Sequence, residues 1–196
     1  MDHNAKTLSS GFGDLVSGAV ASISSLSAIS GRFEEAAALL VSALRAGGKL
    51  LAAGNGGSAA EAMHVAEELS GRYRANRKAL PGLALSADCT AVTCIGNDFG
   101  FDEIFSRQVE AFAAPGDVVA LFTTSGNSRN VVRAAEAAKA AGAKVIAFTG
   151  PGGGALAAVS DVLLAVPEAD RSAHVQEAHQ VLLHALLEKV EEAFPA

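Results

Sequence analysis

The chain has 196 residues, half of them hydrophobic, and a formal net charge of −6 from 15 basic and 21 acidic side chains. This length suits one domain, or one domain with a helical extension. The negative charge, the absence of Trp and the single Tyr argue against nucleic-acid binding as its main role. Two cysteines, Cys89 and Cys94, make neither a disulfide framework nor a metal-binding pair. No signal peptide or bilayer-length apolar run is evident, so we expect a cytoplasmic protein without a membrane partner.

Two helices are expected before the first strand. Apolar residues recur at helical spacing from Leu15 to Leu26 and again from Phe33 to Leu44, with a break at Gly31. They predict an N-terminal helical extension over residues 1–47, followed by a main domain over residues 48–196. The apolar faces of these helices need a partner surface, and both a neighbouring subunit and the domain itself remain open as that partner.

The most informative stretch is KLLAAGNGGSAAEAMHVAEELSGRY, residues 49–73. A short apolar strand, Lys49–Ala53, leads through a glycine-rich turn into an amphipathic helix that Ser58 is expected to cap. The free amides and the dipole of a helix N-terminus attract anions, so a phosphate is the expected guest. Such turns also occur without a ligand, and this one matches neither the Walker loop nor the dinucleotide fingerprint.

His64 and Glu68 stand four residues apart in the same predicted helix, and therefore on one of its faces. An imidazole and a carboxylate beside an anion site suggest acid–base chemistry or a metal, although on spacing alone such a pair is more often a solvated surface pair. A long helix expected over residues 172–193 carries three more histidines. Of these, His174 and His179 are compatible with simple exposed positions, which leaves His184 as the candidate for chemistry.

Strands and helices alternate through the rest of the chain. Apolar runs predict strands at residues 82–85, 117–122, 144–148 and 162–166, and helices at 88–95, 101–113 and 129–141, with a turn at 96–100. This pattern indicates an α/β fold: a three-layer open parallel sheet with helices on both faces. Ligands of such sheets bind beyond the carboxyl ends of the strands, where the turn 54–58 and the hydroxyl-rich turn 123–128 would meet. Together they suggest a cradle for the phosphate of a small metabolite.

Four segments together resemble the bacterial phosphoheptose isomerases of the sugar-isomerase (SIS) domain superfamily. They are GNGGS with HVAEELSGRY, IGNDFGFDEIFSRQV, TSGNS and VQEAHQVLLH. The TSGNS turn alone indicates the superfamily, whereas the AMHVAEEL helix together with His184 narrows the resemblance to the isomerases. It covers about residues 46–193 and implies a SIS-type, flavodoxin-like fold.

The resemblance implies an aldose–ketose isomerase that converts sedoheptulose 7-phosphate to D-glycero-D-manno-heptose 7-phosphate, a precursor of envelope heptose such as that of lipopolysaccharide. It also implies a homotetramer with sites at subunit contacts, and one Zn²⁺ per subunit. Glu68 would be the base and His184 its acid–base partner. The implied zinc ligands are His64, Glu68, Gln176 and His184. The implied substrate contacts are Asn55, Gly56, Gly57, Ser58, Asp98, Thr123, Thr124, Ser125, Ser128 and Gln176. Among them, the phosphate would be held by Ser58, Thr123, Ser125 and Ser128. The sugar hydroxyls would be held by Asn55, Asp98 and Thr124.

A binding protein is the alternative reading. Initiator-associating SIS proteins share this fold and bind a replication initiator protein without catalysis. They lack counterparts of Glu68 and His184, and this chain has both, which favours the isomerase.

Overall fold

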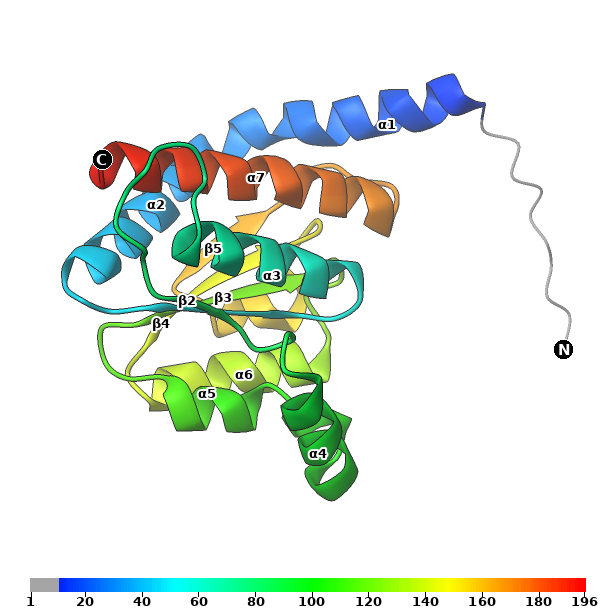
Figure 1. The fold of residues 1–196 in the computed structure, drawn as a ribbon. Coiled ribbons are helices and arrows are strands. Elements are labelled where there is room, and N and C mark those ends of the chain that lie inside the picture. The colour runs from blue at the N-terminus through cyan, green and yellow to red at the C-terminus, as the bar shows by residue number, and fades with distance from the viewer. Residues whose placement is uncertain (1–10) are drawn as a thin grey trace, which may run out of the picture.

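Five parallel strands form one sheet in the computed structural model, which describes residues 11–196 (Figure 1). The strands are β1 (Leu50–Gly54), β2 (Gly82–Ala84), β3 (Val118–Thr123), β4 (Lys144–Thr149) and β5 (Val162–Ala165). They lie in the order β2-β1-β3-β4-β5, and every neighbouring pair is parallel. This is the strand order of flavodoxin-like folds, so the predicted fold class is confirmed.

Helices cover both faces of the sheet (Figure 1). They are α1 (Phe12–Ser25), α2 (Ser30–Arg45), α3 (Gly57–Ser70), α4 (Cys89–Phe99), α5 (Ser106–Phe112), α6 (Arg129–Ala140) and α7 (Ser172–Ala193), with short 3₁₀ segments η1 (Leu26–Ile29), η2 (Phe101–Glu103) and η3 (Gly154–Ala158). Helices α2, α3 and α7 lie on one face, and α5 and α6 on the other. Helix α4 projects from the body and has no buried residue.

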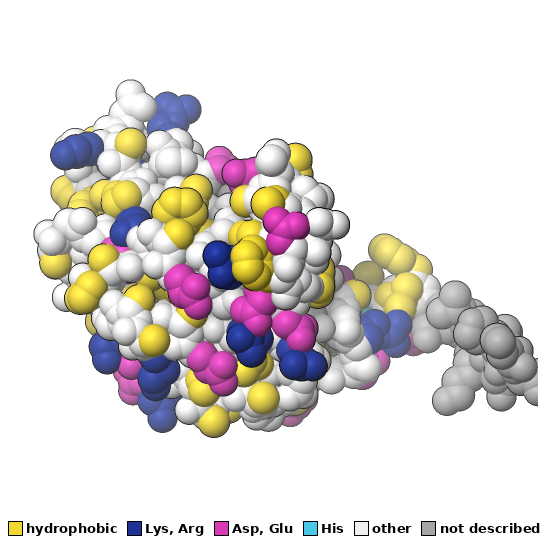
Figure 2. Space-filling model, turned by 90° about the horizontal axis from the view of Figure 1, so that it is seen from below, with side chains coloured by type: hydrophobic (Ala, Val, Ile, Leu, Met, Phe, Trp, Pro, Cys, Tyr) yellow, Lys and Arg dark blue, Asp and Glu magenta, His cyan; other side chains and the backbone are white. Residues whose placement is uncertain are grey.

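Helix α1 extends beyond the body of the molecule and leaves most of its apolar side chains in solvent. Phe12 is 82% exposed and Val20 56%, and Leu15 and Val16 are also exposed. Figure 2 shows apolar side chains at the outer end of this projection, whereas basic and acidic side chains intermingle on the adjacent body. By length and composition alone, Phe12–Arg45 is the one stretch within residues 11–196 that is apolar enough to cross a membrane. The expectation of no such stretch is therefore wrong by this criterion.

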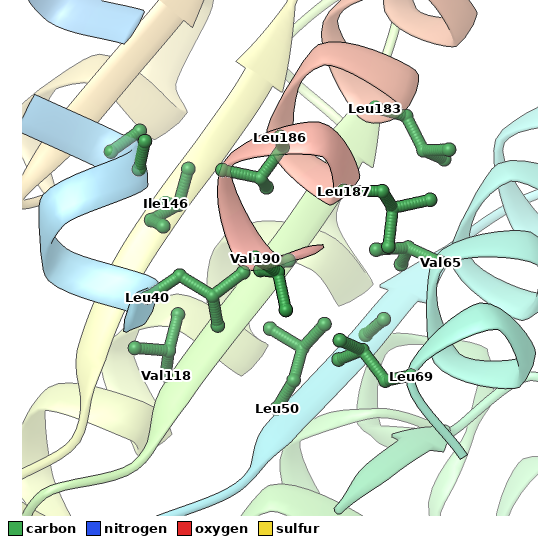
Figure 3. Packing of buried hydrophobic residues seen from close by; sticks show 14 of the residues in the cluster. Leu40, Leu50, Val65, Leu69, Val118, Ile146, Leu183, Leu186, Leu187 and Val190 are labelled. Atoms are coloured by element: carbon green, nitrogen blue, oxygen red, sulfur yellow. The ribbon is translucent and has the colours of Figure 1, made fainter. Parts of the chain in front are cut away.

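Helix α2, in contrast, folds back onto its own domain. Leu40 from α2, Leu69 from α3 and Leu186 from α7 meet side chains of the sheet in one cluster (Figure 3). Side chains of a strand alternate between faces, so Leu50 enters this cluster and Leu51 the cluster on the opposite face. Burying one such leucine contributes about 1.5–3 kcal/mol. The two early helices thus take different partners: α2 packs on the sheet, while α1 contacts α7 along one side only.

Four local predictions were wrong. Gly56, not Ser58, is the N-cap of α3, and Ser58 lies inside the helix. The expected turn at 96–100 is helical as far as Phe99, because Asp88 caps α4 with two hydrogen bonds and the turn-forming residues continue the helix. The expected helix 101–113 is split into η2 and α5, and the expected break at Gly31 falls earlier, in η1.

Candidate active site

A polar cavity of about 140 Å³ lies where β1 and β3 end. It is lined by Asn55, Ser58, Phe122, Thr123, Thr124, Ser128 and Gln176. The turn after β1, the turn after β3 and the start of α7 therefore converge on one space. The two turns meet at the carboxyl edge of the sheet, where ligands of this fold class bind.

Two glycines allow this convergence. A Cβ atom on Gly57 would lie 2.2 Å from Nε2 of Gln176, so a side chain there would force the end of the Gln176 side chain away from the turn. Gly126 has a φ of +68°, and a Cβ atom on it would lie 2.1 Å from the carbonyl oxygen of Gly153. At position 126, only glycine adopts this positive φ and allows the close approach of the Gly153 carbonyl without strain.

Hydroxyl groups supply most of the hydrogen-bonding capacity of the cavity. Oγ1 of Thr123 lies 3.2 Å from Oγ of Ser128 and 3.5 Å from Oγ of Ser125. Ser58 is buried, whereas Ser125 is exposed and accepts a hydrogen bond from the amide of Asn127. The amide of Ser58 already donates to the carbonyl oxygen of Asn55, so the expected free amides of this turn are partly used within the turn itself.

A second cluster lies further along α3. Nε2 of His64 is 3.4 Å from Oε1 of Glu68, and the ring of His184 on α7 meets the His64 ring edge to face with centroids 5.2 Å apart. The His64 and Glu68 side chains are partly exposed, at 28% and 18%. The structure thus brings together three of the residues that the sequence analysis singled out, from two helices far apart in the chain.

The donor set of this cluster fits a metal ion. Within the described residues, the group of three potential ligands with atoms inside 4.8 Å of one another is His64, Glu67 and Glu68. Imidazole nitrogen and carboxylate oxygen are both ligands of Zn²⁺. Glu67 was not among the residues that the sequence analysis proposed. Its position next to Glu68 in the sequence could have indicated it as a further ligand.

Gln176 and Asp98 lie apart from this cluster. Gln176 contacts the turn at Gly57, two helical turns before His184, and about 12 Å along the axis of α7 separates the two residues. Asp98 lies exposed on α4, where it contacts Asn97 and Cys94. Within one chain, Gln176 therefore belongs to the cavity at the turns, and Asp98 to neither group.

Several polar contacts at the site could not be seen in the sequence. Tyr73 lies beside His184, with ring centroids 6.3 Å apart, and its hydroxyl donates to Oε1 of Glu188 at 3.2 Å. Burial, and next the negative charge of Glu188, raise the pKa of Tyr73 above its usual value. Tyr73 therefore stays a neutral hydrogen-bond donor at physiological pH.

Behind the cavity, Nδ1 of His179 lies 3.4 Å from Oε2 of Glu61, and both side chains are almost fully buried. Oε1 of Glu61 and Nε2 of His179 have no hydrogen-bond partner among the described residues. His174 is also buried, against Gly18 of α1, and contacts Asp170 at 2.6 Å. The expectation that His174 and His179 are exposed is therefore wrong, because α7 turns both toward packed neighbours.

Comparisons with known proteins agree with this geometry. A family model described as the SIS domain matches residues 17–150. The phosphoheptose isomerase of Rhodospirillum rubrum is 50% identical over 159 residues, which cover 81% of this chain and 84% of that protein. The phosphoheptose isomerase of Vibrio cholerae is 48% identical over 160 residues, covering 82% and 83%. Among solved structures, the phosphoheptose isomerase of Neisseria gonorrhoeae has a TM-score of 0.86 at 40% identity, covering 92% of this chain and 96% of that one.

The chain belongs to the phosphoheptose isomerase family of SIS-domain proteins. The resemblance found in the sequence is confirmed, and the chain is an isomerase. Distant matches add no more than the fold: the sugar isomerase domain of the RpiR transcription factor of Sphaerobacter thermophilus is 18% identical, with a TM-score of 0.62. The roles of individual residues in this family member stay predictions.

Proposed function

We propose that this phosphoheptose isomerase family member converts sedoheptulose 7-phosphate to D-glycero-D-manno-heptose 7-phosphate through an enediol. The observation that carries the proposal is the alignment of the cavity and the His64 cluster along two parallel helices. Gln176 of α7 contacts the start of α3 at Gly57, and Gln180 contacts His64 further along both helices. Six residues of helix separate Ser58 from His64, about 9 Å. An extended seven-carbon sugar phosphate has a comparable length.

The cavity would bind the phosphate. Hydroxyls of Ser58, Thr123 and Ser128 face a space that holds no charged side chain among its lining residues. Hydrogen bonds to a charged group contribute about 1.5–3 kcal/mol each. Binding at this end would place the carbonyl end of the sugar beside the His64 cluster.

Glu68 and His184 would carry the proton transfers. The Glu68 carboxylate takes a proton from C1 of the ketose, which leaves the enediol, and returns it to C2. His184 moves the hydroxyl proton from the oxygen on C1 to the oxygen on C2. The product is therefore an isomer of the substrate, and no second reactant is needed. Positioned acid–base groups each contribute about 10²- to 10⁴-fold in rate. The neutral Tyr73 hydroxyl near His184 fits a role as a donor rather than as a base.

Zinc is part of the proposal because the donor set fits it. His64 and Glu68 would hold the ion, with His184 as the further ligand that the resemblance implies and Glu67 as a nearby carboxylate. Gln176, which the resemblance also implies, lies in the cavity at the turns of the same chain and is left out of this ligand set. When bound, zinc would polarise the substrate carbonyl as a Lewis acid. His64 would then serve as a ligand only, while Glu68 would serve both as a ligand and as the base.

We also propose a homotetramer in the cytoplasm, with residues 1–47 as the N-terminal extension and 48–196 as the SIS unit. Residues 1–10 of that extension lie outside the described residues. The exposed apolar positions of α1 favour a protein partner for this helix. Two free cysteines, both exposed, fit a reducing compartment. Nucleic acid is not expected as a partner, because the chain has a formal net charge of −6.

The test is to incubate the pure protein with sedoheptulose 7-phosphate and follow the sugar signals by NMR. A new heptose phosphate is expected with the wild type and not with Glu68→Gln. If neither protein makes a product, the catalytic proposal fails, and the non-catalytic SIS binding protein becomes the better reading.

A further inference from the structure

The side chains of Asn55 and Asn130 exchange two hydrogen bonds. Nδ2 of Asn55 donates to Oδ1 of Asn130 at 2.9 Å, and Nδ2 of Asn130 donates to Oδ1 of Asn55 at 2.8 Å. Asn130 is only 2% exposed. Each amide thus donates one hydrogen bond to the other and accepts one from it, in a reciprocal pair whose Asn130 half is buried.

This pair joins the two turns that form the cavity. Asn55 lies in the turn between β1 and α3, and Asn130 is the second residue of α6, directly after the hydroxyl-rich turn that follows β3. Of the hydroxyl residues that line the cavity, Ser58 follows β1, on the Asn55 side, and Thr123 and Ser128 follow or end β3, on the Asn130 side. The residues are 75 positions apart in the chain, so no local backbone interaction fixes this distance.

We propose that Asn130 is a positioning residue that clamps the two turns through Asn55 and sets the distance between the hydroxyls on either side of the cavity. The inference rests on the proposed function in taking the cavity as the phosphate subsite. Donors already held in place lose little freedom when they bind an anion, so the clamp raises affinity without contacting the ligand. Asn130 does not line the cavity, whereas Asn55 does.

The clamp also adds to the role of Asn55. The resemblance implied that Asn55 holds a sugar hydroxyl. One N–H and one lone pair of its amide are bonded to Asn130, which orients the amide and leaves its second N–H and second lone pair for a ligand. Removing Asn55 leaves the buried amide of Asn130 without its bonds, which weakens the turn even where the ligand is never touched.

The experiment compares the binding of inorganic phosphate and the steady-state kinetics of three variants. Asn130→Ala removes both bonds, Asn130→Asp keeps an acceptor for Nδ2 of Asn55, and Val131→Ala is the matched control. Val131 is the next residue of α6, and its side chain is fully buried in the cluster between the sheet and the layer of α5 and α6. Its truncation therefore loosens the same helix without removing a side-chain contact between the two turns.

Asn130→Ala should weaken phosphate binding, measured by ³¹P NMR titration, about tenfold, and raise KM for the sugar phosphate by a similar factor while kcat changes less than about threefold. Asn130→Asp keeps one bond but places a carboxylate beside the phosphate subsite, so its phosphate binding should be weakened at least as much as that of Asn130→Ala. Val131→Ala should lower the melting temperature but leave the phosphate dissociation constant unchanged. Phosphate binding by Asn130→Ala equal to wild type overturns the clamp, and so does equal weakening by Val131→Ala. A wild type that binds phosphate in the cavity but makes no heptose phosphate counts against the proposed function alone.

Discussion

Nδ1 of His64 lies 3.2 Å from Oε1 of Gln180, across the contact between α3 and α7. An amide oxygen only accepts hydrogen bonds, so this contact favours the His64 tautomer that carries its proton on Nδ1, with the Nε2 lone pair facing Glu68, 3.4 Å away. Two acceptors in that arrangement repel each other unless a cation or a proton lies between them. If His64 is a metal ligand, as proposed, Gln180 is the residue that orients its ring.

Gln180→Leu should therefore change the tautomer of His64. Partners of this kind fix the ring orientation of ligating histidines, and their loss typically costs about 10- to 100-fold in metal affinity. We expect ¹⁵N NMR of the metal-free protein to show a mixture of His64 tautomers, and zinc competition to show at least about tenfold weaker binding. Gln180→Glu keeps an acceptor and is the matched control. An unchanged tautomer and unchanged zinc affinity in Gln180→Leu would contradict this role.

Glu68→Gln should keep the fold and nearly abolish turnover, because glutamine has the shape of glutamate but cannot accept the carbon-bound proton. His184→Ala should be similarly inactive, and the double variant little worse than either single variant, since the effects of residues that act as a unit are not additive.

Metal content must be measured on each variant beside its rate. A metal-stripped wild type that stays active while Glu68→Gln is inactive identifies Glu68 as the base. Near-normal turnover by Glu68→Gln would exclude the catalytic assignment.

Ser58→Ala should raise KM more than it lowers kcat. Ser58 is buried in the wall of the cavity, and one hydroxyl bond to an anion contributes about 1.5–3 kcal/mol, which is about 10- to 150-fold in binding. Ser125→Ala is the informative comparison, because Ser125 is exposed and bonded to the amide of Asn127. Its effect on KM should be smaller. If kcat alone fell in Ser58→Ala, the phosphate assignment would be wrong.

Stability below neutral pH should depend on Asp117. Burial alone would raise its pKa, but hydrogen bonds from the Lys49 ammonium and from the amides of Lys49 and Ala114 outweigh burial and hold the pKa of Asp117 below its usual value. A lowered folded pKa means that the ionised form stabilises the fold above the unfolded pKa of about 3.9, and that this contribution is lost as pH falls through the folded value.

Asp117→Asn should therefore cost about 3 kcal/mol at pH 7, and the difference from wild type should shrink as the pH falls below about 4. Urea unfolding across this range measures it. Asp161→Asn is the control, since Asp161 makes a similar contact with Lys144 but is more exposed, and its loss should be smaller. A difference that stays constant from pH 7 down to the acid transition would refute the linkage.

The sheet and most helices were predictable because their signals are local. The apolar stripe of residues 172–193 and the strand 144–148 follow from periodicity within a few turns or pleats. Residues 96–100 misled the prediction, because their glycine and asparagine favour a turn and the capped helix before them overrides that weak preference. Local composition cannot register such competition between neighbouring segments.

The site was predictable in its residue types but not in its pairings. His64, Glu68 and His184 were found from spacing and resemblance, and they do lie together. Asn130 and Gln180 were missed, because their partners lie 75 and 116 positions away and no periodicity connects them. Only the packing of α3 against α7, and of β1 against β3, creates these contacts.

Helix α1 should hold the subunits together. A single apolar helix this exposed is unusual unless another surface covers it, and Val16 lies among the exposed apolar positions. Val16→Lys should bury a charge in that contact and shift the protein from four times the 19.7 kDa chain mass to smaller species. Size exclusion with light scattering at micromolar concentration measures this. Ala140→Lys adds the same charge at an exposed end of α6 and should leave the mass unchanged. A wild type that is monomeric, or a Val16→Lys variant that stays tetrameric, would rule out α1 as the contact.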